Sequence, residues 1–545
     1  MGEILALYDV RGIQDYIFRT PKIKEAVGAS KIIENIYMDA LENAVCNYNN
    51  RTDKNSVIYD FEWCTNDGVK EYKPSIEDIQ VVYIGGGNAC VIFSSETLAS
   101  DITRLMSKYV IEATYSLQLA AAFVNKTDDY ARDYEKLRQR MAEVKDSMAV
   151  SRPIGTLPVM KMELKTGYPL EYRVGKKILP DDKSKETAIK YEKGWEIRKK
   201  NEKSAQILDS FIIKKEFDST LAVIHIDGNS MSTRIASLLR GITDYSEAVN
   251  RMREISYRIN QSFKNTYKEM ETYFNLTAGK LKAFEHKEEK DHFVAGILVA
   301  GDDITYICNG QIAFSTVEYF VKRINAMGMY GSDDTEDLLK YGFTVCAGVA
   351  FINSHFPFSI GYEVAEACCS SAKKEAKKEE HIENNRIGNW IDFQICKNIQ
   401  AQNLKRIRER EYITPQGEVL CIRPYVIPTE QDPDGLIMRK LYKDKPYKSF
   451  TSFCEKMKYL QDPKKVPKSL VKQLRNTYPL GSLQTEQLLS FMKSRNWKLP
   501  EDSKLYYETA KDNVKIAALY DALELMDDYT DVLGVKGDEK DEMSD

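Results

Sequence analysis

The chain has 545 residues, of which 43% are hydrophobic and 29% are charged, and its length suits about three or four domains of roughly 150 residues. The hydrophobic fraction excludes wholesale disorder, and the net charge of −4 excludes a protein that is basic along its whole length. No cysteine pair has C-x-x-C spacing, and no apolar run is long enough to cross a membrane. Asp9 and Arg11 interrupt the apolar run that a signal peptide needs, so we expect a cytoplasmic protein without membrane contact.

Three segments of the first half recur in the second half, in the same order and at nearly constant displacement. The pairs are 5–12 with 221–228, 82–93 with 298–308, and 120–125 with 348–353. One such match between apolar runs would be ordinary, but three collinear matches indicate a duplicated domain.

Each copy is predicted to contain a strand, a long helix, a strand–turn–strand unit, a helix, a strand and a final helix. In the second copy the expected strands are 220–227, 294–300, 304–309 and 343–352, and the expected helices are 244–274, 312–327 and 361–380. The β-α-β-β-α-β order favours a ferredoxin-like fold, which is the fold of polymerase and cyclase palms. The predicted class is therefore α+β, with two palm domains in tandem.

The remaining segments are predicted to be mainly helical. We expect a degenerate first palm over 1–125, a helical linker domain over 126–215, a catalytic second palm over 216–395 and a mostly helical C-terminal domain over 396–545. Within the last region, Glu418–Tyr425 has the pattern of a strand.

The second copy carries a candidate catalytic centre at Gly301-Asp302-Asp303, in a tight turn between two apolar strands. Asp227 ends the strand that this fold places beside that hairpin. Three converging carboxylates repel one another unless a cation neutralises them, so Asp227, Asp302 and Asp303 are predicted catalytic and metal-binding residues for Mg²⁺ or Mn²⁺. Such a cluster suits two-metal phosphoryl transfer, whereas Gly-Asp-Asp alone is also compatible with an ordinary acidic turn.

The first copy lacks these carboxylates. Aligned with the second copy, it has Arg11, Gly87 and Asn88 at the three positions, so we expect no catalytic metal there. Its glycine-rich turn could still let backbone amides approach a phosphate or a base, with Gly86 and Asn88 as nucleotide-binding residues. A simple tight hairpin explains the same glycines equally well.

Several short motifs together resemble the large subunit of type III CRISPR effector complexes. They are Arg11–Phe18 and Gly28–Ser30 in the first copy, and Asp227–Met231, Gly301–Asp303, Cys346–Ala350, Ser371–Lys373 and Arg423–Tyr425 in or after the second. The resemblance covers roughly 1–125 and 216–425.

This resemblance implies a synthetase that joins ATP into cyclic oligoadenylates, with two nucleotides held between the palms. Lys373 would face a triphosphate, and Gly28 and Ser30 would lie near a nucleotide, while Asn229 and Gly301 complete the implied nucleotide-binding set. Lys373 also fits a solvated helix face. Because both palms lie in one chain, a monomer should be competent, and a complex with other CRISPR-type subunits is expected.

The chain departs from the family pattern at several points. We expect neither the N-terminal HD nuclease nor the zinc ribbon, Asn229 stands where the family usually has an aspartate, and Ala300 precedes Gly301 where a second glycine is usual. Two alternatives therefore stay open, a catalytically silent nucleotide-binding scaffold and a single-product dinucleotide cyclase.

A stretch rich in Lys and Arg, 438–475, is a candidate RNA-binding surface. Its aromatic side chains are Tyr442, Tyr447, Phe450, Phe453 and Tyr459. Basic and aromatic residues together can bind phosphates and stack bases, but the same pattern arises when the aromatics of helices form a core.

Overall fold

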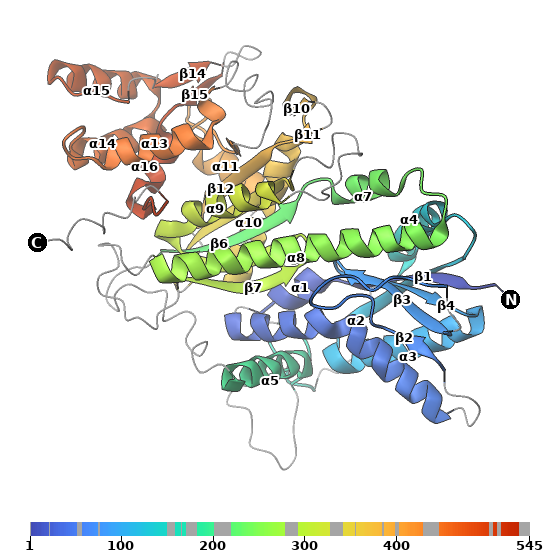
Figure 1. The fold of residues 1–545 in the computed structure, drawn as a ribbon. Helices are drawn as coiled ribbons and strands as arrows, with labels where there is room; N and C mark the ends of the chain where they lie inside the picture. Colours follow the sequence, from blue (N-terminus) through green and yellow to red (C-terminus); the bar gives the residue numbers. More distant parts are fainter. Residues whose placement is uncertain are drawn as a thin grey trace, which may run out of the picture. The chain divides into compact units, whose positions relative to one another are not determined.

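A computed structural model gives the structure of the chain. It describes residues 2–20, 22–51, 57–74, 77–149, 159–164, 166–170, 183–200, 220–277, 293–327, 342–354, 356–383, 386–397, 403–428, 446–500, 505–508 and 514–533. The chain divides into two compact units, which are described separately (Figure 1). The first comprises Met1–Gln206, Ser230–Asn265 and Ile297–Ile304, and the second comprises Ile207–Asn229, Thr266–Gly296 and Thr305–Asp545.

The first unit is built on a five-stranded sheet in the order β2-β3-β4-β1-β5. Its strands are β1 (Ile4–Arg11), β2 (Tyr59–Asp60), β3 (Ile79–Gly85), β4 (Asn88–Phe93) and β5 (Gln118–Asn125), and its helices include α1 (Ile13–Phe18), α2 (Ile23–Arg51) and α3 (Glu96–Thr114). The central strand β1 is antiparallel to both β4 and β5, as the ferredoxin-like fold requires. Helices α2 and α3 pack on each other and lie along one face of this sheet (Figure 1).

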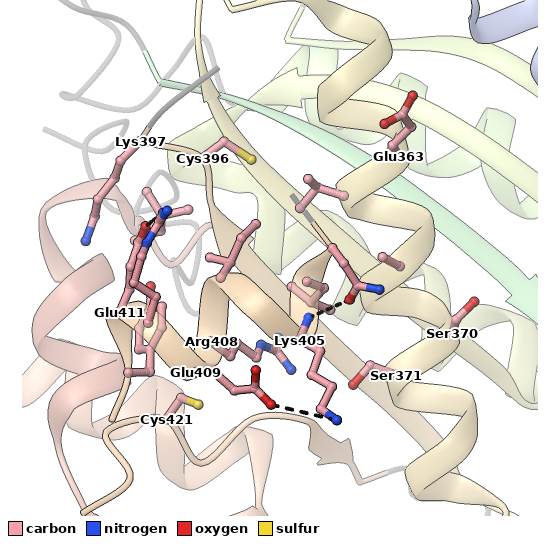
Figure 2. Close-up of a pocket in the computed structure, with 18 of the residues that line it drawn as sticks. Glu363, Ser370, Ser371, Cys396, Lys397, Lys405, Arg408, Glu409, Glu411 and Cys421 are labelled. Carbon is pink, nitrogen blue, oxygen red and sulfur yellow. Dashed lines mark hydrogen bonds and ion pairs between the residues drawn. The ribbon is translucent and has the colours of Figure 1, made fainter. Parts of the chain in front are cut away.

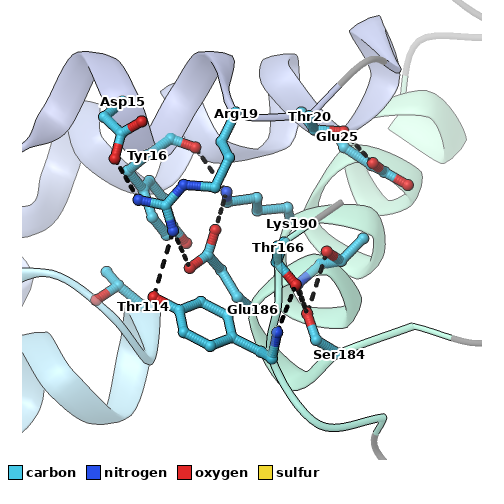
Figure 3. Close-up of polar contacts among 12 residues, drawn as sticks. Asp15, Tyr16, Arg19, Thr20, Glu25, Thr114, Thr166, Ser184, Glu186 and Lys190 are labelled. Atoms are coloured by element: carbon cyan, nitrogen blue, oxygen red, sulfur yellow. Dashed lines mark hydrogen bonds and ion pairs between the residues drawn. The ribbon is translucent and has the colours of Figure 1, made fainter. Parts of the chain in front are cut away.

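Two further helices join this unit from the segment between the copies, α4 (Tyr130–Ser147) and α5 (Lys185–Lys200). A buried polar network ties α5 to α1 and α2 (Figure 3). Lys190 forms a 2.5 Å ion pair with Glu186 and donates to the carbonyl oxygen of Tyr16 at 2.6 Å, and Lys183 pairs with Glu25 at 2.6 Å. The described helices of the predicted linker therefore pack with the first copy, while the proposed division into four domains stays a prediction.

The second sheet has the order β13-β12-β9-β6-β8-β7. Its strands are β6 (Thr220–Gly228), β7 (Val294–Ala300), β8 (Asp303–Asn309), β9 (Val345–Asn353), β12 (Asn389–Ile395) and β13 (Tyr425–Ile427), and its helices include α9 (Ala313–Ala326) and α10 (Phe358–Ala376). Strand β9 is antiparallel to β6 and parallel to β12. Gly348 lets α10 lie directly on β9, because a Cβ there would be 1.9 Å from the carbonyl oxygen of Ala365.

Strand pairing confirms the duplication that the sequence predicts. Ile4 lies opposite Asn125 and Arg11 opposite Gln118 in the first sheet. Thr220 lies opposite Asn353 and Asp227 opposite Cys346 in the second. The two pairings have the same register, and both strand–turn–strand units leave two residues for the turn. The predicted α+β fold with two ferredoxin-like sheets is confirmed.

Three elements of the second copy and of the segment after it differ from the expectations: an additional helix before the long one, the unpredicted strand β12, and the strand expected over 418–425. The predicted helix 244–274 is preceded by a separate helix, α7 (Met231–Leu239), and is itself α8 (Tyr245–Thr277). The strand expected over 418–425 is wrong, since β13 begins only at Tyr425. The amides of Ile422 and Arg423 donate to the Asp521 carboxylate and are therefore not available to a neighbouring strand.

The C-terminal part of the second unit is mainly helical, as expected. It contains α11 (Leu404–Glu411), α13 (Phe450–Gln461), α14 (Lys468–Thr477), α15 (Ser482–Ser494) and α16 (Tyr520–Leu525), with a small hairpin of β14 (Tyr506–Glu508) and β15 (Lys515–Ala517). None of the helices described in the structure combines the length and apolar character needed to cross a membrane.

Candidate nucleotide-binding site

The two hairpin turns adopt their conformations because glycine occupies the positions with positive φ. Gly86 and Gly87 have φ values of 58° and 77° in the β3–β4 turn, and Gly301 has a φ of 61° in the β7–β8 turn. Residues with a Cβ rarely adopt such values, which explains glycine at these places. In the second copy only the first turn residue has a positive φ, so the next position accommodates Asp302.

Within the first unit, the tips of these two hairpins touch. A Cβ on Gly301 would lie 3.0 Å from Cα of Gly86, so the absence of a side chain permits this approach. Tyr37 of α2 supports the neutral turn, because its hydroxyl donates to the carbonyl oxygen of Gly87 while accepting from the Val10 amide at 2.9 Å.

A cavity of about 360 Å³ lies at this meeting point and is formed entirely by the first unit. Gly86, Asn88, Gly301 and Asp302 line it, which brings together four of the residues predicted from the sequence. The other walls come from β1, β3, α4, α7 and α8. Among their lining residues are the charged Asp9, Arg138 and Lys145, the polar Ser232, Ser256 and Asn260, and the apolar Met231, Ile235, Met252 and Ile259. Sequence reasoning missed these side chains.

An ion pair joins two walls of the cavity. Nζ of Lys145, on α4, lies 2.5 Å from Oδ2 of Asp9, on β1. Burial raises the pKa of Asp9 above its usual range, against the opposing effect of Lys145. The other lining cation, Arg138, is on the same helix.

Asp303 begins strand β8 and contacts the first copy. Nε2 of Gln14, on α1, donates to Oδ2 of Asp303 at 3.3 Å. Gln14 belongs to the Arg11–Phe18 motif, so the structure links that motif to the acidic turn within the first unit.

Asp227 and Lys373 belong to the second unit and form an ion pair there, with Nζ of Lys373 donating to Oδ2 of Asp227. Burial alone would lower the pKa of Lys373, but the charge and hydrogen bond of Asp227 outweigh it and raise that pKa. Lys373 is thus held by a carboxylate and is not simply a solvated side chain. Its contact with a triphosphate stays a prediction.

Asn229 is buried and is held by hydrogen bonds to neighbouring residues. It is only 2% exposed, and its Nδ2 donates to Oγ1 of Thr344 at 3.3 Å and to the carbonyl oxygen of Gly388 at 3.2 Å. The backbone N–H of Asn229 also donates to the Thr344 carbonyl oxygen at 2.8 Å. These contacts fix the residue after the β6 strand, and a nucleotide contact by Asn229 stays a prediction.

Gly28 and Ser30 lie on α2 and do not line the cavity. A Cβ on Gly28 would be 2.0 Å from the carbonyl oxygen of Lys190, and one on Gly194 would be 2.4 Å from that of Lys24. The two glycines therefore allow α2 and α5 to pack closely, and this close packing explains why residue 28 is a glycine. The nucleotide contacts of Gly28 and Ser30 stay predictions.

The predicted metal ligands are divided between the units, with Asp302 and Asp303 in the first and Asp227 in the second. Over the described part of the chain, no three His, Cys, Asp or Glu side chains are grouped so that they could hold a metal ion. The donor type nevertheless fits, because adjacent carboxylates at a turn supply the hard oxygen ligands that Mg²⁺ takes, and Asp302 borders the cavity.

A larger cavity, of about 730 Å³, lies in the second unit between α10 and α11 (Figure 2). None of the predicted site residues lines it. Its charged side chains are largely satisfied by neighbours, since Arg408 pairs with the buried Asp392 at 2.6 Å and Lys397 with Glu524 at 2.8 Å. It is therefore the weaker candidate for binding an ionic substrate.

The basic stretch 438–475 is described from residue 446 onward, and the part with Tyr442 lies outside the described residues. Phe450 and Phe453 are buried, at 1% and 2% exposure, and pack edge-to-face against Phe314. Lys458 is paired with Asp531. These contacts give the aromatics a place in the core, and RNA binding by this stretch stays a prediction.

No protein-family model matches the chain, and no curated protein matches it. Two duplicated ferredoxin-like sheets, with helices between and after them, define a tandem-palm fold, and solved structures share it. The chain is similar to Csm1 in T. onnurineus, with a TM-score of 0.51 and 12% sequence identity over 96% of this chain and 69% of that one. At 12% sequence identity, this similarity is evidence for a shared fold alone.

Two Csm1–Csm4 structures are also similar to the chain. A Csm1–Csm4 cassette in complex with cA4 has a TM-score of 0.47 and 13% identity, over 97% of this chain and 70% of that one. The Csm1–Csm4 subcomplex in the type III-A CRISPR-Csm interference complex has a TM-score of 0.46 and 13% identity over the same shares. The resemblance to the large subunit, predicted from motifs, is thus confirmed for the fold.

Proposed function

We propose that the chain is a nucleotidyltransferase that joins ATP, or other nucleoside triphosphates, into cyclic oligonucleotides serving as second messengers in antiviral, CRISPR-type defence. The observation that carries this proposal is the meeting of the acidic turn at Gly301 and Asp302 with the neutral turn at Gly86 around one cavity. Joining nucleotides requires two of them to be held in register, so that a hydroxyl lies beside a phosphate. The fold shared with Csm1 supports the same function.

In the proposed reaction, the 3′-oxygen of one nucleotide bonds to the α-phosphorus of another, the bond to pyrophosphate breaks, and the hydroxyl proton passes to solvent. Bound Mg²⁺ or Mn²⁺ would activate the hydroxyl and neutralise the triphosphate. Asp302, Asp303 and Asp227 would hold the metal. Gln14 orients the Asp303 carboxylate through its hydrogen bond, and Lys373 neutralises Asp227.

The cavity offers the groups that a nucleotide needs. Cations on α4 suit phosphates, serine and asparagine side chains suit a ribose or base edge, and Met231, Ile235 and Met252 provide an apolar wall for a base. Other CRISPR-type subunits are proposed partners, with RNA bound through 438–475.

The test is to incubate the purified chain with each nucleoside triphosphate and Mg²⁺ or Mn²⁺ and to determine product masses. Cyclic products from ATP would support the proposal, and the Asp302→Asn variant should make none, because it loses a metal-binding charge while keeping the size of the side chain. Asp67→Asn, at an exposed aspartate in another turn, is the matched control and should retain full activity.

The same experiment separates the two alternatives. A single cyclic dinucleotide would identify a dinucleotide cyclase, and no product with any nucleotide or metal, with or without added RNA, would favour a nucleotide-binding scaffold. Full activity in Asp302→Asn would overturn the assignment of the acidic turn.

A further inference from the structure

Helix α4 presents one face to the cavity, and that face carries two cations. Tyr134, Arg138, Met141 and Lys145 all line the cavity, at the spacing of three and four residues that places side chains on one side of a helix. Met141 is buried, whereas Arg138 and Lys145 keep partial access to solvent. No sequence motif predicts a functional role for this helix.

The two cations differ in what holds them. Lys145 is bound by Asp9 at 2.5 Å, and the Asp9 side chain is largely buried. The ion pair of Arg138 with Glu135 is long, at 3.8 Å, and both side chains are exposed to solvent, so it contributes little to stability. An anion that entered the cavity would therefore meet one weakly engaged guanidinium and one ammonium already shared with a carboxylate.

The chemistry of these groups matches a phosphate chain. A guanidinium binds phosphate oxygens through two parallel N–H donors, and an ammonium binds them as a point charge. The separation along α4 from Arg138 to Lys145 is about two helical turns, or roughly 10 Å, which suits more than one phosphate group. The cavity volume of about 360 Å³ is within the size range of small-ligand sites.

We propose that Arg138 and Lys145 of α4 bind the phosphate groups of one nucleotide in this cavity, and that Asp9 competes with those phosphates for Lys145. This inference rests on the proposed function for the identity of the ligand as a nucleotide. It assigns α4 as a wall of the substrate site and Asp9 as a residue that weakens binding. The adenosine part is then left to the apolar and small polar side chains of α7 and α8.

The test measures equilibrium binding of ATP and of adenosine by calorimetry, in EDTA so that no metal contributes. Arg138→Gln and Lys145→Gln should each weaken ATP binding by about tenfold or more, since each removes a hydrogen bond to a charged group. Adenosine binding should be unchanged. Asp9→Asn should strengthen ATP binding, because it releases Lys145 and removes a negative charge from the cavity.

Matched controls lie on the same helix. Arg140→Gln and Lys136→Gln remove the same charges from exposed positions that do not line the cavity, and both should leave ATP binding unchanged. Circular dichroism of each variant checks the fold. If Lys145→Gln unfolds the protein, the Asp9→Asn variant and the Arg138 and Arg140 pair still decide the matter.

Several outcomes would overturn the inference. They are equal losses in the lining and control variants, parallel losses of ATP and adenosine, weaker ATP binding in Asp9→Asn, or no ATP binding by the unaltered chain. Product synthesis is measured separately. A chain that binds ATP through Arg138 and Lys145 but makes no product would retain this inference and lose the proposed function.

Discussion

The β3–β4 and β7–β8 hairpins are the same structure with different chemistry. Both end their first strand at equivalent positions, both turn through two residues, and both place glycine with a φ near 60° at the first turn position. One continues with Gly87 and Asn88, and the other with Asp302 and Asp303. The comparison teaches that the backbone decides where a side chain is presented, while two residues decide whether the turn carries the carboxylates that the proposed metal needs.

The largest expected effect comes from making the acidic turn identical to the neutral one. The double change Asp302→Gly and Asp303→Asn should keep the hairpin, since the first copy folds with those residues. It should lower the rate of product formation by at least about 1000-fold, because both carboxylates are lost. Product yield from ATP measures the effect. A double variant that retains activity would show that the two turns do not differ in the proposed way.

The reverse change should not create a second active centre. With Gly87→Asp and Asn88→Asp in a chain that also carries Asp302→Asn, we expect no product, because Arg11 is at the position equivalent to Asp227. The melting temperature should also fall, since Gly87 has a φ of 77° that aspartate adopts at a cost. Recovered activity would contradict the comparison.

A smaller loss is expected from Gln14, which reaches the acidic turn from the first copy. Gln14→Leu should lower activity by about 10- to 100-fold, as for other groups that orient metal-binding carboxylates, and should raise the Mg²⁺ concentration needed for half-maximal rate. The neighbouring Asp15→Asn is the control, because Asp15 is exposed and pairs only with Arg19 in the contacts described. An unchanged Mg²⁺ requirement in Gln14→Leu would remove the positioning role.

Alanine at Gly301 should destabilise more than alanine at Gly86. Both glycines have positive φ, so each substitution costs about 1–2 kcal/mol of backbone strain. Only the Cβ at Gly301 would also press on neighbouring backbone, at 3.0 Å from Gly86, whereas a Cβ at Gly86 has nothing within 4 Å. Thermal denaturation of the two variants measures the difference, and equal melting temperatures would argue that the hairpins do not touch.

The last prediction is the absence of an effect. If both nucleotides are held by one chain, the specific activity should stay constant on dilution of the protein. Specific activity that falls in proportion to protein concentration would show that the site forms between two chains.

Local chemistry made the fold and the turns predictable. Continuous apolar runs such as that of β1 identify central strands, and glycine followed by polar residues identifies hairpin turns. The predicted strands of the second copy agree with β6, β7, β8 and β9 to within a few residues. The missed strand β12 lies just beyond the duplicated part, where no second copy exists to reveal it.

The residues of the candidate site could be predicted only where they belong to a recognisable sequence motif. Arg138 and Lys145 lie on a helix with many charges, and their spacing alone does not distinguish a cavity wall from an exposed face. Conversely, Gly28 has the appearance of a ligand-binding glycine, but a helix–helix contact that only the tertiary structure shows explains it. Sequence therefore identified the turns and not the walls around them.

The bonds made by Asp521 have a consequence for the order of folding during synthesis. Its carboxylate accepts from the amides of Ile422 and Arg423 and, at 2.7 Å, from the hydroxyl of Tyr425, a partner 96 residues earlier in the chain. Those donors are buried, so they cannot be satisfied by water once the edge of the second sheet closes. Strand β13 can therefore reach its final hydrogen bonding only after the ribosome has synthesised α16, so this edge of the second sheet forms after the strands that precede it in the chain.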